Sequence, residues 1–175
     1  MLLVRAGDLD KMSLLFNRHY RSLYSFLYHM TYNREASEDM VQNVFYRMLK
    51  YRHTFTGKGE FAIWMFHLGR NILKDNAKKQ QRTGKHDDIS NLSEKVSGGV
   101  LADEQFGKKQ ELFQLYKAMA RLSDDEREIL TLNKFQELKY HEIAQILNIN
   151  EGAVKVRVHR AFNQLKTIYQ KNGLI

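Results

Sequence analysis

The chain has 175 residues and carries 28 Lys and Arg against 20 Asp and Glu, so its formal net charge is +8, and it contains no Cys and no Pro. The absence of Cys excludes a disulfide framework, a thiolate zinc site and cysteine-based catalysis. The excess of positive charge indicates a polyanionic partner, with nucleic acid ahead of a membrane surface. The first apolar stretch is too short for a secretion signal and no stretch fits a membrane span, so we expect a cytoplasmic protein.

Helical periodicity dominates the first half of the chain. Apolar residues recur there at spacings of three and four, which predicts helices that each bury one face. We therefore predict an N-terminal helical domain over residues 1–83. Its three apolar stripes are Phe16, Tyr20, Leu23, Tyr24, Leu27 and Met30, then Val41, Val44, Phe45, Met48 and Leu49, then Phe61, Trp64, Met65, Leu68 and Ile72.

The segment after this domain is polar and has no apolar stripe. It contains Gly84, Gly98 and Gly99, which is typical of a flexible linker, and we predict one over residues 84–106. Acidic residues outnumber basic ones between residues 87 and 104, whereas basic residues are concentrated in residues 70–85 and 155–171. Two basic patches on either side of an acidic linker predict two binding surfaces on two modules.

Helical signals resume near Gln105 and define a predicted C-terminal domain over residues 107–175. Ser123 is followed three residues later by Glu126, a pattern typical of a capping box at the start of a helix. No segment alternates with a period of two, so we predict an all-α fold of two small helical domains. The apolar positions of this half are Leu112, Leu115, Tyr116, Met119 and Leu122, then Ile129, Leu130 and Leu132, then Ile143, Ala144 and Leu147.

Residues 140–166 have the pattern of a helix-turn-helix. Ala144 is small enough for two helices to cross, Asn148 tolerates the turn, and Ile149 supplies the apolar residue after it. We expect the second helix to turn Val154, Val158, Phe162 and Leu165 inward. The alternative is an αα-hairpin with a solvated basic face. The outer face is expected to contact DNA through Lys155, Val156, Arg157, His159, Arg160 and Lys166, with Arg157 and Lys166 better placed for phosphates.

Four segments of the sequence carry a resemblance to one protein family. EIAQILNINEGAVKVRVHRAFNQL resembles the promoter-binding helix-turn-helix of bacterial RNA polymerase sigma factors, and of the small extracytoplasmic function (ECF) subgroup in particular. RLSDDEREILTL resembles the helix before that motif, with Ser123 where the family often has Pro. FNRHYRSLYSFLYHMTYNREASEDMVQNVFYRMLKYRHTF is similar to the first two helices of the conserved sigma domain. FAIWMFHLGRNILKDNAKKQQR resembles its helix that opens and holds the minus-ten element, and the order of the motifs is that of the family.

The resemblance implies a non-enzymatic factor that binds RNA polymerase core and directs it to promoters. Its partners would be the largest-subunit clamp and the flap of the polymerase, promoter DNA, and the anti-sigma factor that the family often uses, with no membrane partner and a monomer when free. The core-binding residues would be Glu38, Asp39, Gln42 and Asn43, although Asn43 stands where the family usually has an acid. Periodicity alone predicts that these four residues form a solvated helix face. The resemblance instead favours a core-binding surface.

The minus-ten element would meet the N-terminal domain on a polar helix face and on a loop. We expect Trp64 to pack in the core rather than to stack on a base. The loop of residues 54–60 contains Gly57 and Gly59, which let a backbone approach a base closely. The expected DNA contacts are Lys58 in the loop and Arg70, Asn71, Lys74, Lys78 and Lys79 on the helix, which would follow phosphates, with Asn71 also placed to read a base edge.

The sequence offers no support for catalysis. Its seven histidines never pair at the spacing of an HExxH-type site, and no Gly-rich phosphate loop is present. We therefore predict no catalytic, metal or cofactor site. Two alternatives stay open. One is a stand-alone helix-turn-helix regulator that binds an operator without polymerase, usually as a dimer. The other is an enzyme with a helical active site, which requires perturbed titratable groups in a pocket.

Overall fold

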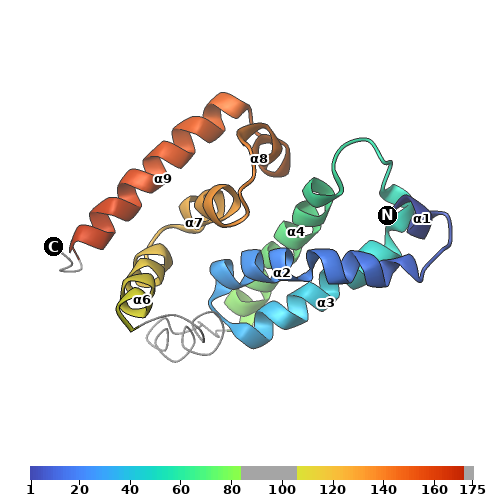
Figure 1. Cartoon of the computed structure of the whole chain (residues 1–175), viewed down its shortest axis with the longest axis horizontal. Coiled ribbons are helices and arrows are strands. Elements are labelled where there is room, and N and C mark those ends of the chain that lie inside the picture. The colour runs from blue at the N-terminus through green and yellow to red at the C-terminus, as the bar shows by residue number, and fades with distance from the viewer. Residues whose placement is uncertain (84–105, 172–175) are drawn as a thin grey trace.

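The computed structural model describes residues 1–83 and 106–171. Every regular element within these two ranges is a helix, which confirms the predicted all-α fold. Figure 1 shows two groups of helices side by side, with α1 to α4 in the N-terminal half and α6 to α9 in the C-terminal half. The predicted linker, residues 84–106, lies outside the described residues except for Phe106, where α6 begins. Among the described helices, none is both long and apolar enough to span a bilayer.

The N-terminal half contains three long helices and two short ones. They are α1 (Leu2–Arg5), α2 (Lys11–Thr31), α3 (Arg34–Lys50), the 3-10 helix η1 (Arg52–Thr54) and α4 (Phe61–Thr83). Between α2 and α3, Tyr32 adopts the left-handed conformation with φ 50° and ends α2. Asn33 then caps α3 by accepting a hydrogen bond from the Ala36 N–H at 3.1 Å. This two-residue connection makes α2 and α3 a helical hairpin.

The core of the N-terminal half forms where the three stripes face one another. Phe26 is fully buried and meets the edge of Phe66, with ring centroids 5.3 Å apart. Gly69 lets α4 approach α2 closely, because a Cβ at that position would lie 3.2 Å from Leu23 Cδ1. Phe16 lies at the edge of the core, since it is 37% exposed while it still contacts Phe45. Phe26 and Phe66 were not among the predicted stripes. The buried members of the stripes are Leu23, Leu27, Val41, Val44, Phe45, Met48, Met65 and Ile72.

The C-terminal half begins with α6 (Phe106–Ala120) and α7 (Asp124–Leu130). A π-helical turn, η3 (Thr131–Phe135), extends α7, and α8 (Tyr140–Leu147) and α9 (Glu151–Lys171) complete the half. The predicted capping box is present at the start of α7. Ser123 Oγ accepts a hydrogen bond from the Glu126 N–H, and the Glu126 carboxylate accepts one from the Ser123 N–H at 3.1 Å. As expected, Ile129, Leu130 and Leu132 are buried.

Removal of this cap gives the first testable expectation. Ser123→Ala should lower the free energy of unfolding by about 1 kcal/mol, because N–H groups at the start of α7 lose their side-chain acceptor. Chemical denaturation followed by circular dichroism measures the change. Thr167→Ala is the control, since the Thr167 hydroxyl donates to the Asn163 carbonyl inside α9 and caps no helix end. Equal stability of the Ser123 variant and the wild type would contradict the expectation.

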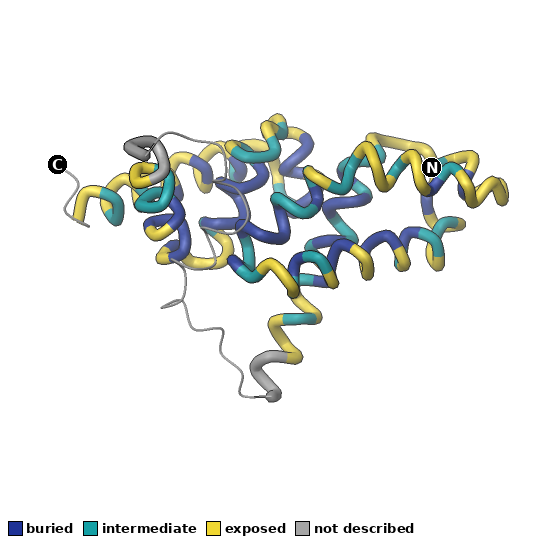
Figure 2. Tube along the Cα trace, turned by 60° about the horizontal axis from the view of Figure 1, so that its bottom comes forward, coloured by how far each residue is buried: buried dark blue, intermediate teal, exposed yellow. Residues whose placement is uncertain are grey.

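The two halves share one hydrophobic core. α8 packs against α4, and η3 and α7 pack against α2. Figure 2 shows buried positions continuing from one half into the other. The sequence predicted two domains and their order, but it did not predict this contact between them.

Candidate nucleic-acid interface

The turn between α8 and α9 has the backbone geometry of a helix-turn-helix. α8 ends at Asn148, which has a left-handed φ of 54°, as the sequence predicted. The Ile149 N–H donates back to the Ala144 carbonyl at 3.0 Å, which closes the end of α8. Asn150 Oδ1 then accepts a hydrogen bond from the Ala153 N–H at 2.7 Å at the start of α9. These local bonds fix the direction in which α9 leaves α8.

The outer face of α9 is exposed along its length. Figure 1 shows α9 at the outer edge of the C-terminal half. The expectation that Phe162 faces inward is wrong, because it is 50% exposed whereas Ala161 is fully buried. The buried positions advance from Val154 to Val158 to Ala161, and Phe162 lies about 100° further around the helix. The predicted DNA-contacting residues are all exposed, namely Lys155, Val156, Arg157, His159, Arg160 and Lys166.

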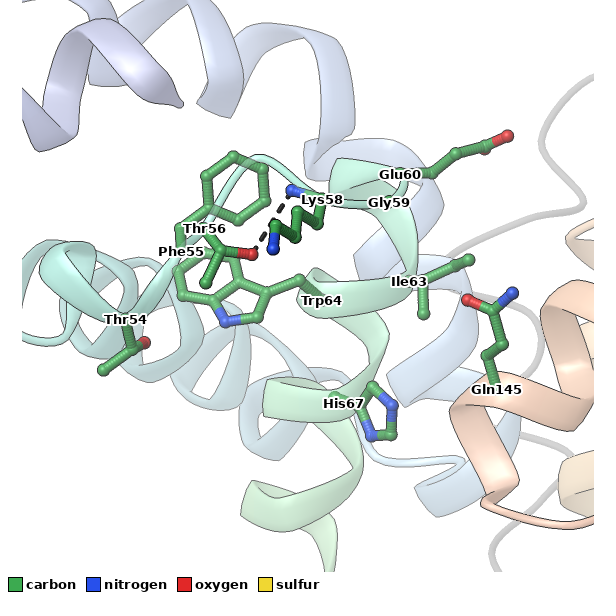
Figure 3. Close-up of a pocket in the computed structure, with 10 residues that line it drawn as sticks. All are labelled: Thr54, Phe55, Thr56, Lys58, Gly59, Glu60, Ile63, Trp64, His67 and Gln145. Carbon is green, nitrogen blue, oxygen red and sulfur yellow. Dashed lines mark hydrogen bonds between the residues drawn. The ribbon is translucent and has the colours of Figure 1, made fainter.

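A pocket of about 190 Å³ lies at the start of α4. Figure 3 shows it between the loop that precedes α4, the first turns of α4, and Gln145 of α8. The loop residues predicted to meet an unstacked base therefore form one wall, and the C-terminal half contributes another. The residues that line the pocket are Thr54, Phe55, Thr56, Lys58, Gly59, Glu60, Ile63, Trp64, His67 and Gln145.

The loop wall has a defined conformation. Phe55 is 7% exposed and anchors the loop on Trp64, with ring centroids 5.3 Å apart. The Lys58 N–H donates to Thr56 Oγ1 at 3.2 Å (Figure 3). Gly57 has a φ of 77°, which only glycine adopts without steric strain. The backbone of this loop is thus held between an aromatic anchor and a tight turn.

Trp64 has two environments. It packs against Phe55 and against Phe61, whose ring centroid lies 6.1 Å away, as expected for a core residue. It is only partly buried, however, and it also lines the pocket. One edge of the indole therefore supports the loop while another part faces the pocket.

The polar face of α4 is divided by the contact between the halves. Arg70, an expected phosphate contact, instead forms an ion pair within the protein, with Nε 2.7 Å from Glu128 Oε1 of α7. Their side chains are 21% and 10% exposed. The other expected DNA contacts on this helix, Asn71, Lys74, Lys78 and Lys79, are exposed.

The polar face of α3 is open to solvent. Asp39, Gln42 and Asn43 are exposed, and Glu38 is partly exposed and pairs with Arg34 at 2.9 Å. Tyr46 extends this face by one turn and is 62% exposed. Sequence reasoning missed Tyr46, although its place four residues after Gln42 marks the same face. Within the part of the chain that the structure describes, no cluster of His, Asp and Glu could hold a metal ion.

Two family models match this chain on the elements just described. Sigma-70 region 2 matches residues 15–83, and Sigma-70, region 4 matches residues 112–165. The chain belongs to the sigma-70 family of RNA polymerase sigma factors. Region 2 thus covers most of α2 and all of α3 and α4 of this sigma factor. Region 4 covers the second part of α6 through most of α9, and α1 lies before the region 2 match.

Similar proteins place this sigma factor in the ECF group. ECF RNA polymerase sigma factor SigX of Bacillus subtilis is 27% identical over 90% of this chain and 82% of SigX. SigM of the same organism is 29% identical over 90% of this chain and 94% of SigM. The ECF RNA polymerase sigma-E factor of Escherichia coli K12 is 27% identical over 90% of this chain and 86% of that protein.

Solved structures share the fold of this sigma factor. The sigma factor RpoE of Bartonella quintana, in complex with the anti-sigma factor NepR, superposes with a TM-score of 0.73 at 22% identity, over 90% of this chain and 96% of RpoE. CnrH, in complex with the cytosolic domain of CnrY, also gives a TM-score of 0.73, at 18% identity over 98% of this chain and 96% of CnrH.

Polar contacts join the two halves of this sigma factor. Ser22 Oγ donates to Gln136 Oε1 at 2.6 Å, and Gln136 Nε2 donates to Ser25 Oγ at 3.3 Å. His67 of α4 and Gln145 of α8 line the same pocket from opposite halves. Sequence reasoning missed Glu128, Gln136 and Gln145 as functional positions, because nothing near them in sequence shows which helix they will meet.

Two histidines lie where the halves meet, His29 buried and His67 half-buried at the pocket. His29 is 4% exposed, its Nδ1 donates to the Ser25 carbonyl at 2.6 Å, and its ring centroid lies 4.0 Å from that of Phe135. Burial lowers the pKa of His29 and the pKa of His67 below the ordinary value of 6.5, so both rings are neutral at pH 7. Since the folded-state pKa is lowered, their contribution to stability is full above about pH 6.5 and is lost as the pH falls through the folded pKa.

Proposed function

We propose that this sigma factor acts in the bacterial cytoplasm, where it binds RNA polymerase core, directs it to promoters and performs no chemistry of its own. The observation that carries the proposal is that two sigma-70 regions fold as two halves, each with an exposed polar face that bears basic residues. The division into an N-terminal domain (1–83), a linker (84–106) and a C-terminal domain (107–175) is part of the proposal.

The polar face of α3 is the surface we assign to the polymerase clamp. Glu38, Asp39, Gln42 and Asn43 offer carboxylate and amide groups there, and we add Tyr46. Exposed tyrosines are frequent anchors of protein interfaces, because they combine a large apolar ring with a hydroxyl. The flap of the polymerase is the second contact that we propose, on the C-terminal half.

The pocket and the polar face of α4 are the surface we assign to the minus-ten element. Phe55 and Trp64 give the pocket an aromatic wall on which an unstacked base can lie, and Lys58 adds a positive charge at the loop. Arg70, Asn71, Lys74, Lys78 and Lys79 would follow the backbone of the strand. Because Gln145 lines the same pocket, a base that enters there would also meet α8 of the C-terminal half.

The exposed face of α9 is the surface we assign to the minus-thirty-five element. If Arg160 or Lys155 contacts a base edge, Arg160→Ala or Lys155→Ala should weaken binding by about 1–3 kcal/mol and relax specificity at that base. Binding of the reconstituted polymerase to promoters with single changes in the minus-thirty-five element measures this. Lys78→Ala serves as the contrast. Loss of a phosphate contact should weaken binding to all promoter sequences alike and lower the slope of log affinity against log salt concentration by about one. Unchanged selectivity of both variants would argue against base reading by α9.

In vitro transcription with purified core enzyme tests the function directly. We expect initiation at specific promoters only when this sigma factor is added, and we expect it to co-purify with core. A stand-alone regulator would instead bind free operator DNA tightly as a dimer. A gel shift without polymerase and a mass measurement separate the two, because we expect weak binding of free DNA and a monomer.

An anti-sigma factor is the further partner that we propose. The relative RpoE is seen in complex with the anti-sigma factor NepR. Affinity capture from cells with and without a crosslinker, followed by reconstitution of the captured protein with this sigma factor, tests it. A captured protein that leaves transcription unchanged would not be an anti-sigma factor.

A further inference from the structure

The short helix α1 packs against the loop that forms one wall of the pocket. Val4 is fully buried, and α1 contacts both α2 and η1. Figure 1 shows α1 at the end of the N-terminal half, beside the point where the chain leaves η1 for the loop. α1 precedes the range that the region 2 model matches, whereas η1 and most of α2, which it contacts, lie within that range.

A hydrogen bond joins α1 to the backbone of the loop. Arg5 Nη1 donates to the Phe55 carbonyl oxygen at 3.0 Å, across 50 residues of sequence. The Phe55 carbonyl belongs to the peptide that leads to Thr56, and both Phe55 and Thr56 line the pocket. The guanidinium therefore holds the orientation of a peptide group at the pocket wall. A charged donor makes this bond stronger than one between neutral groups.

An apolar contact fixes the same loop two residues further on. Leu2 is 55% exposed, and its covered part lies on Gly57, where a Cβ would come within 2.9 Å of Leu2 Cδ2. Gly57 also has the positive φ that forms the tight turn of the loop. Leu2 and Arg5 thus hold two successive parts of the loop from the same helix.

We propose that α1 is a positioning element that holds the loop in the shape that receives one base of the minus-ten strand. Arg5 and Leu2 would thereby set the preference for that base without touching DNA. The inference rests on the function proposed for the pocket. Its physical basis is that base discrimination depends on where the polar groups of a pocket wall point, and the Arg5 bond decides the direction of one of them.

The preference of the polymerase for each base of the minus-ten element tests the proposal. Holoenzyme is reconstituted with Arg5→Ala, Leu2→Ala or Arg5→Lys and assayed on promoters that carry each of the four bases at each position. We expect Arg5→Ala to reduce discrimination about threefold to tenfold at one position, the range that loss of one hydrogen bond gives. Arg5→Lys should retain part of it. Arg21→Ala and Leu14→Ala are the matched controls, since both residues are exposed on α2. An equal loss at all positions, or no loss at any, would overturn the proposal.

Trp64 provides a second measurement that needs no polymerase. It is the single tryptophan of the chain and packs on Phe55 of the loop. We expect Arg5→Ala to increase acrylamide quenching of its fluorescence, while circular dichroism shows unchanged helix content. Unchanged quenching would overturn the proposal that α1 holds the loop in position. If the wild-type holoenzyme initiates at no promoter, the proposed function fails instead. The quenching experiment still reports whether Arg5 of α1 holds the loop in place.

Discussion

Phe26→Ala is expected to lower the free energy of unfolding by about 3–5 kcal/mol. Phe26 is fully buried in α2, its ring meets Phe66 of α4 at 5.3 Å, and α4 comes close beside it at Gly69. α2 and α3 are joined by a two-residue connection and α4 approaches α2 closely at Gly69, so these helices can move only partly to fill the space. Truncation therefore removes apolar contacts and leaves a cavity.

Urea denaturation followed by circular dichroism measures the effect of Phe26→Ala. Phe162→Ala is the matched control, because it removes the same atoms from a side chain that is 50% exposed, and we expect a change within about 0.5 kcal/mol. The whole free energy of unfolding of a native protein is about 5–15 kcal/mol. The Phe26 variant should therefore also lose promoter-specific transcription at growth temperature. A larger effect at Phe162 than at Phe26 would contradict the packing described here.

Glu128→Ala is expected to shift the two halves from the packed arrangement towards an open one by about 10- to 100-fold. Arg70 loses its charged partner, and a hydrogen bond between charged groups contributes about 1.5–3 kcal/mol. The pair is mostly enclosed, at 21% and 10% exposure, so water replaces the lost bond poorly. In the open arrangement, Arg70 becomes available to DNA and Gln145 no longer lines the pocket.

Two measurements report on the Glu128 variant. Small-angle scattering of the free chain should show a larger radius of gyration, and a single-stranded minus-ten oligonucleotide should bind the free chain more tightly than it binds the wild type. Asp75→Ala is the control, because it removes the 2.9 Å ion pair with Arg47 inside the N-terminal half. If Asp75→Ala opens the molecule as much as Glu128→Ala, the Arg70–Glu128 contact does not hold the halves together.

The exposed faces of α9 and α3 were only partly predictable from sequence. Arg160 and Lys155 were correctly expected to be exposed, because Val154 and Val158 occupy the buried face of the helix and charged residues take the open one. Phe162 was placed wrongly, because its spacing from Val158 fits the inner face as well as that of Ala161 does, and only the packed position of α9 separates them. Tyr46 was missed because the expected contacts on that helix were limited to its charged and amide residues, although its spacing from Gln42 places it on the same face.

The sequence by itself determined the long helices and two of their ends, but not α1, η1 or the π-helical turn η3. Periodicity, the Ser123–Glu126 box and the turn at Asn148 act over a few residues, and for that reason they can be read from neighbours along the chain. The tertiary structure alone decided which faces meet. Arg70 and Glu128 are 58 residues apart, and Arg5 and Phe55 are 50 apart. Contacts at that distance depend on how whole helices pack, because packing selects among many polar residues that look alike in sequence. The placement of Arg70 against α7, of Gln145 at the pocket and of α1 under the loop therefore came only from the fold.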